Sequence, residues 1–70
     1  MKYSIPDLWR MFLGNLEHNA NEDIRHAFVL IERDRYQEGL HDRQLRDRVA
    51  AGEYGGTVQR MWEQFQSAND

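Results

Sequence analysis

The segment TVQRMWEQF, residues 57–65, gives the clearest structural signal in the chain. Its apolar side chains recur at positions i, i+3, i+4 and i+7, the spacing that places them on one face of an α-helix. They are Val58, Met61, Trp62 and Phe65. The segment therefore predicts an amphipathic helix over about residues 57–67, with one face buried in a core and the other exposed to solvent.

The same periodicity recurs upstream, within residues 5–16, 24–31 and 45–49. Ser4 is suited to cap the first of these helices, and Gly39 is a natural end for the second. The predicted helices span residues 4–19, 21–38, 41–51 and 57–67, and the residues after 66 are expected to fray. No segment alternates with the period of a strand. The sequence therefore predicts an all-α fold, a compact bundle of three to four short helices, with homodimerisation as one way to complete its core.

Length and composition limit how this fold is stabilised. Seventy residues make a single helical domain without linkers, and a chain of this size buries only about 60% of the surface that it exposes when unfolded. The sequence has no cysteine, which excludes disulfides. No apolar run approaches the roughly 20 residues that span a bilayer, and the first residues lack the apolar region of a signal peptide. We therefore expect a cytoplasmic protein, located in the host cytoplasm if a phage encodes it.

Patterns typical of catalysis or metal binding are missing from the sequence. It contains no phosphate-binding glycine loop, no His-Glu-x-x-His and no nucleophile elbow. His18, His26 and His41 lie eight and fifteen residues apart, a spacing that does not group them on one helix face. Glu22 lies one turn before His26, and we expect an ordinary surface contact from this pair. The sequence therefore predicts a protein that is not an enzyme and that binds neither a metal nor a cofactor.

Residues 32–48 form the most strongly charged stretch. Five arginines are balanced there by five acidic residues, so the local net charge is zero. The pairs Asp42–Arg46 and Arg43–Asp47 have the i, i+4 spacing at which helix side chains can pair. We expect a solvated surface whose charges satisfy one another. A binding face is the alternative if the fold separates the arginines from the acids. Its candidate residues are Arg33, Arg43 and Arg46.

Three apolar or aromatic residues lie off the core stripes. Val29 and Tyr36 are seven residues apart on the second helix, far around it from the stripe that contains Ile31. This helix is therefore predicted to be buried on more than one face, either at the centre of the bundle or against a second copy of the chain. Tyr54 lies in a glycine-containing loop, where it either folds back onto the core or forms an exposed anchor for a partner.

Gly14 lies opposite the apolar stripe of the first helix. Glycine in the middle of a helix is about 1 kcal/mol less favourable than alanine. The residue is therefore a tolerated surface glycine, an early break in the helix, or a point where another backbone approaches closely.

These features favour a small protein–protein interaction module: a regulator, adaptor or inhibitor that binds and blocks a partner protein. Such chains are common among phage and mobile-element accessory proteins, including anti-defence inhibitors. The candidate partner-binding residues are Val29, Tyr36, Tyr54, Arg33, Arg43 and Arg46. The alternative is a small helical, nucleic-acid-binding transcriptional regulator, with a helix-turn-helix formed by the second to fourth helices. A net charge of −3 and a last helix with Arg60 as its one cation argue against it.

Overall fold

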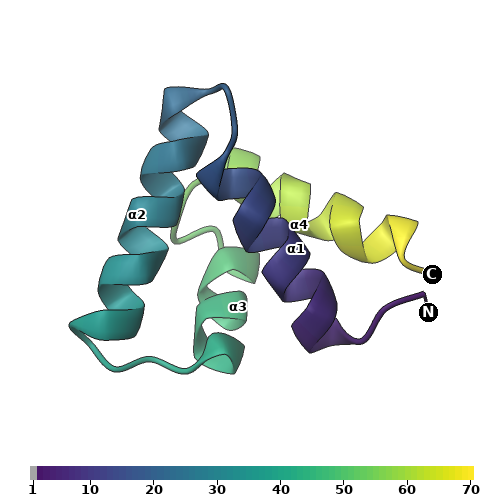
Figure 1. Cartoon of the computed structure of the whole chain (residues 1–70), viewed down its shortest axis with the longest axis horizontal. Coiled ribbons are helices and arrows are strands. Elements are labelled where there is room, and N and C mark those ends of the chain that lie inside the picture. The colour runs from purple at the N-terminus through teal and green to yellow at the C-terminus, as the bar shows by residue number, and fades with distance from the viewer. Residues whose placement is uncertain (1) are drawn as a thin grey trace.

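Residues 2–70, which the computed structural model describes, form four helices and no strand (Figure 1). The helices are α1 (Ile5–Glu17), α2 (Glu22–Tyr36), α3 (Asp42–Ala50) and α4 (Gly56–Ala68). Each predicted boundary lies within two residues of the observed one, and the predicted all-α fold is confirmed. Within this part of the chain, no helix combines the length and the apolar character that crossing a membrane requires.

Polar side chains fix where the helices begin. The Ser4 hydroxyl accepts a hydrogen bond from the backbone N–H of Asp7 at 3.3 Å, and Pro6 lies in the first turn of α1, where its missing N–H is not needed. The side chain of Asn21 accepts from two backbone N–H groups at the start of α2, at 2.8 and 3.3 Å. These caps satisfy backbone donors that a helix leaves unpaired at its N-terminus.

The core lies where α1, α2, α3 and α4 meet. The first helix packs against α2 and α4, and α3 packs against α2 and α4. An aromatic cluster joins the first helix to the last: the ring centroids of Trp9 and Trp62 are 5.4 Å apart in an edge-on contact, and those of Phe12 and Trp62 are 5.1 Å apart. Trp9 is fully buried, and its indole Nε1–H has no acceptor among the described residues. Packing therefore holds this ring in place without a hydrogen bond.

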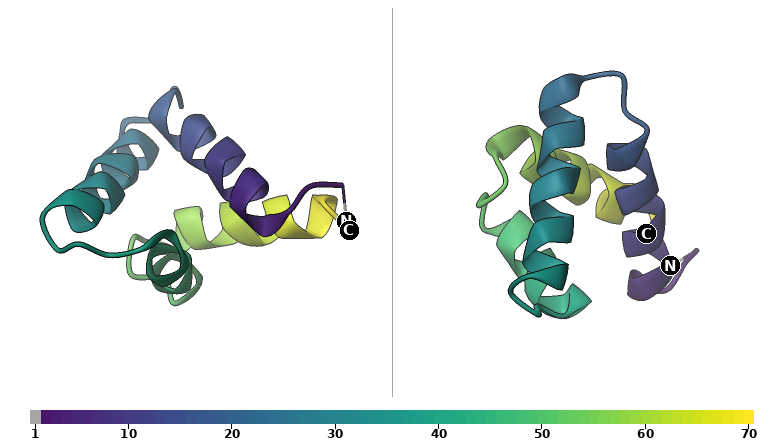
Figure 2. Two further views of the ribbon diagram at one scale, coloured as in Figure 1. Left: turned by 60° about the horizontal axis from the view of Figure 1, so that its bottom comes forward. Right: turned by 60° about the vertical axis from the view of Figure 1, so that its left-hand side comes forward.

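The two ends of the described chain lie side by side (Figure 2). Asn69 is buried and joins them. Its Oδ1 accepts a hydrogen bond from the backbone N–H of Tyr3 at 2.9 Å, and its Nδ2 donates to the carbonyl of Tyr3 at 3.0 Å. The backbone N–H of Lys2 also donates to the Asn69 carbonyl, at 3.1 Å. The prediction that residues after 66 fray is therefore wrong, because this side chain pairs with the segment that precedes α1.

Two glycines, Gly14 in α1 and Gly55 in the turn before α4, differ in whether their positions require glycine. Gly14 lies inside an unbroken helix, and a methyl group added there would meet no atom within 4 Å. It is therefore not a helix break, and no backbone among residues 2–70 approaches it closely. A methyl group on Gly55 would also have open space, but the φ of Gly55 is +104°, a conformation that side-chain-bearing residues rarely adopt.

We predict that Gly14→Ala raises the free energy of unfolding by about 1 kcal/mol, because alanine has the higher helix propensity and meets no obstacle. In a domain of this size the melting temperature rises by about 4–8 °C. Gly55→Ala is the matched control, since it adds the same methyl group to equally open space, and it should lower the melting temperature. Thermal unfolding followed by circular dichroism measures both. A stabilising Gly55→Ala would show that backbone conformation does not constrain this turn.

Candidate interaction surface

Asp34 is a buried carboxylate at the end of the apolar stripe of α2. It follows Ala27 and Ile31 at helical spacing and is 5% exposed. The hydroxyl of Tyr54 donates a hydrogen bond of 2.6 Å to Asp34 Oδ2. Guanidinium groups of Arg48 and Arg33 each lie 3.5 Å from a carboxylate oxygen. These four residues, here called the Asp34 cluster, connect α2 to α3 and to the turn before α4.

The contacts of the cluster shift the pKa values of both its central groups. The hydrogen bond from Tyr54, together with the charges of Arg33 and Arg48, lowers the pKa of Asp34 even though burial acts in the opposite direction. Burial and the neighbouring carboxylate raise the pKa of Tyr54 to about 12. At neutral pH the carboxylate therefore stays ionised and the phenol stays protonated. This arrangement suits a fixed structural link better than proton transfer.

The charged residues of α2 and α3 pair differently from the prediction. Arg35 Nη1 lies 2.6 Å from Asp42 Oδ1 and its Nε lies 3.5 Å from Glu32 Oε1, so this arginine connects α2 to the start of α3. Within residues 2–70, the predicted pairs Asp42–Arg46 and Arg43–Asp47 do not form. For Asp42 the reason is tertiary, because the return of the chain after α2 brings it beside the half-buried Arg35. Arg43 is exposed and Arg46 is half-buried.

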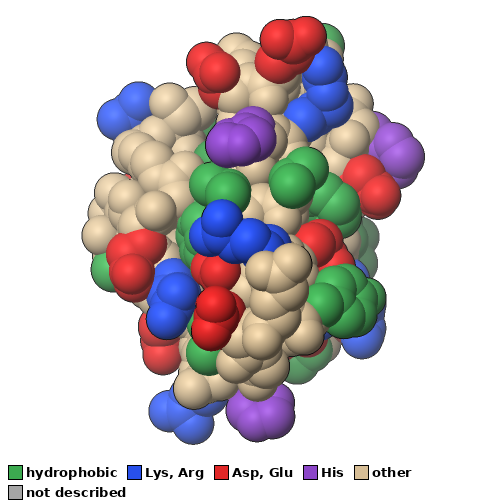
Figure 3. Space-filling view, turned by 90° about the vertical axis from the view of Figure 1, so that its left-hand side faces the viewer, with side chains coloured by type: hydrophobic (Ala, Val, Ile, Leu, Met, Phe, Trp, Pro, Cys, Tyr) green, Lys and Arg blue, Asp and Glu red, His purple; other side chains and the backbone are tan. Residues whose placement is uncertain are grey.

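Val29, Arg33 and Tyr36 share the outer face of α2. Their i, i+4, i+7 spacing forms one row, here called the α2 stripe. Val29 is 58% exposed and Tyr36 is 78% exposed, and the side chain of Arg33 is 53% exposed. The face of the molecule on the α2 side carries acidic, basic and hydrophobic groups in close alternation (Figure 3). The other helices of the chain therefore leave this face of α2 uncovered, although α2 contacts all three of them. Burial of the face within the bundle, one of the two predicted alternatives, is wrong, and its burial against a second copy of the chain stays a prediction.

The other candidates lie elsewhere. Tyr54 is half-buried, and its hydroxyl is engaged by Asp34, so the structure folds this residue back against the protein. It approaches Arg33 only through the shared carboxylate. Arg43 and Arg46 make no ion pair or hydrogen bond with the α2 stripe in the described part of the chain. Of the six candidates, the structure therefore brings three together on one exposed face.

A groove between α1 and α4 was not predicted. It has a volume of about 410 Å³ and lies beside the joined chain ends. Its apolar lining is formed by Tyr3, Leu8, Met11, Phe65 and Ala68. Its polar lining is formed by Lys2, Gln64 and Asn69. We call it the α1–α4 groove. Helix periodicity alone does not reveal it, because it depends on how the two helices pack.

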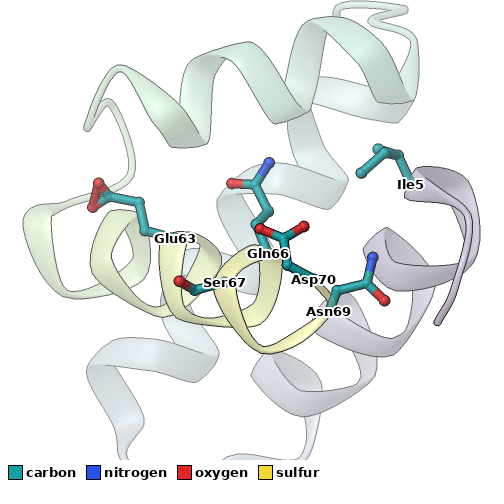
Figure 4. Close-up of a pocket in the computed structure, with 6 residues that line it drawn as sticks. All are labelled: Ile5, Glu63, Gln66, Ser67, Asn69 and Asp70. Atoms are coloured by element: carbon teal, nitrogen blue, oxygen red, sulfur yellow. The ribbon is translucent and has the colours of Figure 1, made fainter. Parts of the chain in front are cut away.

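A second hollow, of about 420 Å³, is lined by the C-terminal half of α4, the two residues that follow it and Ile5 (Figure 4). Ile5 supplies its apolar wall, and Gln66 and Asp70 lie next to each other between Ile5 and Glu63. Its charged groups are the carboxylates of Glu63 and Asp70. Among residues 2–70, no three histidine, aspartate or glutamate side chains gather closely enough to hold a metal ion. This hollow therefore differs from the α1–α4 groove in being acidic.

We predict that the stabilising effect of Asp34 depends on pH. Folding lowers the pKa of this carboxyl, so its contribution to stability is present above the unfolded pKa of about 3.9 and is lost as the pH falls through the folded value. Asp34→Asn should therefore be less stable than the parent chain at about pH 7, and the difference should shrink below about pH 4. Urea unfolding at several pH values measures it. Asp47→Asn, at an exposed position of α3, controls for the change in net charge. A difference that stays constant with pH would contradict the stabilising role of the ionised carboxylate.

Comparison with known proteins identified no relative: no family model matches the chain, no curated protein matches its sequence, and no solved structure matches its fold.

Proposed function

We propose that the chain is a protein–protein interaction module whose α2 stripe binds a partner protein. The observation that carries this proposal is the exposure of Val29 and Tyr36 on one helix face, 58% and 78%, with Arg33 between them. Tyrosine and arginine are enriched among the residues that dominate binding energy at protein interfaces. Large apolar side chains on an exposed helix face favour association, because their removal from water by a partner lowers the free energy of the complex.

The attachment of α2 to the rest of the fold supports this use. Ala27 and Ile31 bury the opposite face of the helix, and the Asp34 cluster anchors its C-terminal half. Arg33 also contacts Asp34, which limits the directions that its guanidinium samples. A helix held in this way presents its outer side chains with little further loss of conformational entropy on binding.

The charge distribution supports a protein partner over a nucleic acid. Three of the five arginines within residues 32–48 contact carboxylates, namely Arg33, Arg35 and Arg48. Paired arginines contribute less to the positive surface that draws a phosphate backbone. The module would act as a regulator, adaptor or inhibitor by covering a partner's surface, the mode of action of an accessory or anti-defence protein of a phage or mobile element. A second copy of this chain is the other protein partner that the α2 stripe suits.

We predict that the double variant Val29→Ser/Tyr36→Ser loses its main protein partner. Truncation of two interface anchors weakens binding about 30-fold or more, while exposed positions contribute within about 0.5 kcal/mol to stability. The measurement is an affinity pull-down from a host-like lysate, with and without nuclease, followed by quantitative identification of the captured protein. Thermal unfolding of the variant establishes that the fold persists.

The matched control is Arg60→Ser/Glu63→Ser, which truncates two exposed side chains of α4 outside both the α2 stripe and the α1–α4 groove and leaves the net charge unchanged. It should retain the partner that the α2 variant loses. Equal capture by all three proteins would refute the assignment of the stripe. Capture of nucleic acid alone, abolished by nuclease, would favour the regulator alternative. Size-exclusion chromatography of the parent and the α2 variant identifies a homodimer formed through the same face.

A further inference from the structure

We propose that the α1–α4 groove is a second binding site, which takes an acidic amphipathic segment of a partner protein. The segment would insert an apolar side chain between α1 and α4 and place a carboxylate near Lys2. This site is separate from the α2 stripe and does not depend on the function proposed for it.

The lining of the groove suits an apolar side chain. Tyr3 and Met11 at its edge are each 47% exposed, whereas Leu8 is buried and Phe65 is half-buried. The volume of about 410 Å³ falls within the range of about 300–1,000 Å³ found for ligand pockets. Methionine is flexible and polarisable, so Met11 can adjust to the shape of an inserted group. Insertion would cover the two exposed side chains and extend the core outward.

The charge of the groove determines which charge a partner segment should carry. Lys2 is the one charged residue of its lining, and it makes no ion pair with any residue from 2 to 70. The hollow lined by the same half of α4 carries Glu63 and Asp70 instead (Figure 4). A chain with a net charge of −3 thus presents a cation without a carboxylate at its apolar groove. Complementarity of charge therefore favours an acidic segment there and disfavours a basic one.

One wall of the groove is held in place before any partner binds. The side chain of Asn69 uses both Oδ1 and Nδ2 to pair with the backbone of Tyr3, at 2.9 and 3.0 Å. These bonds fix the segment that carries Lys2 and Tyr3 against the end of α4. A preformed wall lowers the entropy that binding removes.

A second copy of the chain is a poorer occupant. The α2 stripe is the other exposed apolar surface among the described residues, and Arg33 lies at its centre. If the α2 stripe of a second copy docked into the groove, the guanidinium of Arg33 would come near the ammonium of Lys2, and like charges oppose association. An acidic segment of a different protein meets no such repulsion.

The test uses two capped peptides with the same leucine and phenylalanine residues on one helical face, and with glutamates or lysines on the other. The readout is the ¹³C-methyl NMR signal of Met11, with the signal of Met61 as an internal control because Met61 does not line the groove. We expect the glutamate peptide to shift the Met11 signal without moving that of Met61. The lysine peptide should bind about five- to tenfold more weakly than the glutamate peptide. This difference in affinity should become smaller at high salt, which screens the charges.

Lys2→Glu should reverse the preference between the two peptides while leaving the fold intact, since the side chain is exposed. Val29→Ser/Tyr36→Ser should bind both peptides as the parent does, so the two proposed surfaces succeed or fail separately. A Met11 signal that does not respond, or that responds equally to both peptides, would overturn the proposal. So would a Met11 shift produced by raising the protein concentration alone, which would identify a second copy as the occupant.

Discussion

The contact of Trp9 and Phe12 with Trp62 is the interaction on which the rest of the structure depends. It joins the first helix to the last, with ring centroids 5.4 and 5.1 Å apart. A chain of 70 residues has no disulfide and little core to spare, so a few large rings must supply much of the buried apolar surface. Once α1 and α4 are fixed against each other, the groove between them has a defined shape. The pairing of Asn69 with Tyr3 closes the same end of the molecule.

The other half of the molecule is organised around a charge. Asp34 occupies a position of α2 that helical spacing assigns to the core, and it stays ionised there because Tyr54 and two arginines surround it. Burial of a carboxylate is unfavourable unless hydrogen bonds and opposite charges compensate for it. The Asp34 cluster meets this requirement and directs the turn before α4 toward α2. The outer face of that helix, with Val29 and Tyr36, is thereby held in a constant orientation.

The sequence predicted the elements better than the contacts between them. Helical periodicity is local, so the stripes that contain Leu8, Ile31 and Trp62 were sufficient to place the helices. Residues 32–48, which include Asp34, were assigned to a solvated surface because their charges balance, although the spacing of Asp34 from Ile31 was a signal of its burial. The ion pair of Arg35 with Asp42 and the α1–α4 groove depend on how helices return and cross, which periodicity does not encode. Val29 and Tyr36 could be recognised from the sequence as residues off the core stripe, because the helical pattern itself shows an apolar residue that lies far from the stripe.

The adjacency of the chain ends has a practical consequence for handling the protein. The described chain measures 32 × 26 × 20 Å, with both ends at one extreme of its long axis and α2 at the other (Figure 1). An affinity tag or fluorescent label attached at either end therefore stands beside the groove and far from the outer face of α2. A short peptide linker could join the two ends into a circular permutant, with new ends opened in an exposed loop. Such a permutant would carry its tag away from the groove and leave both surfaces accessible.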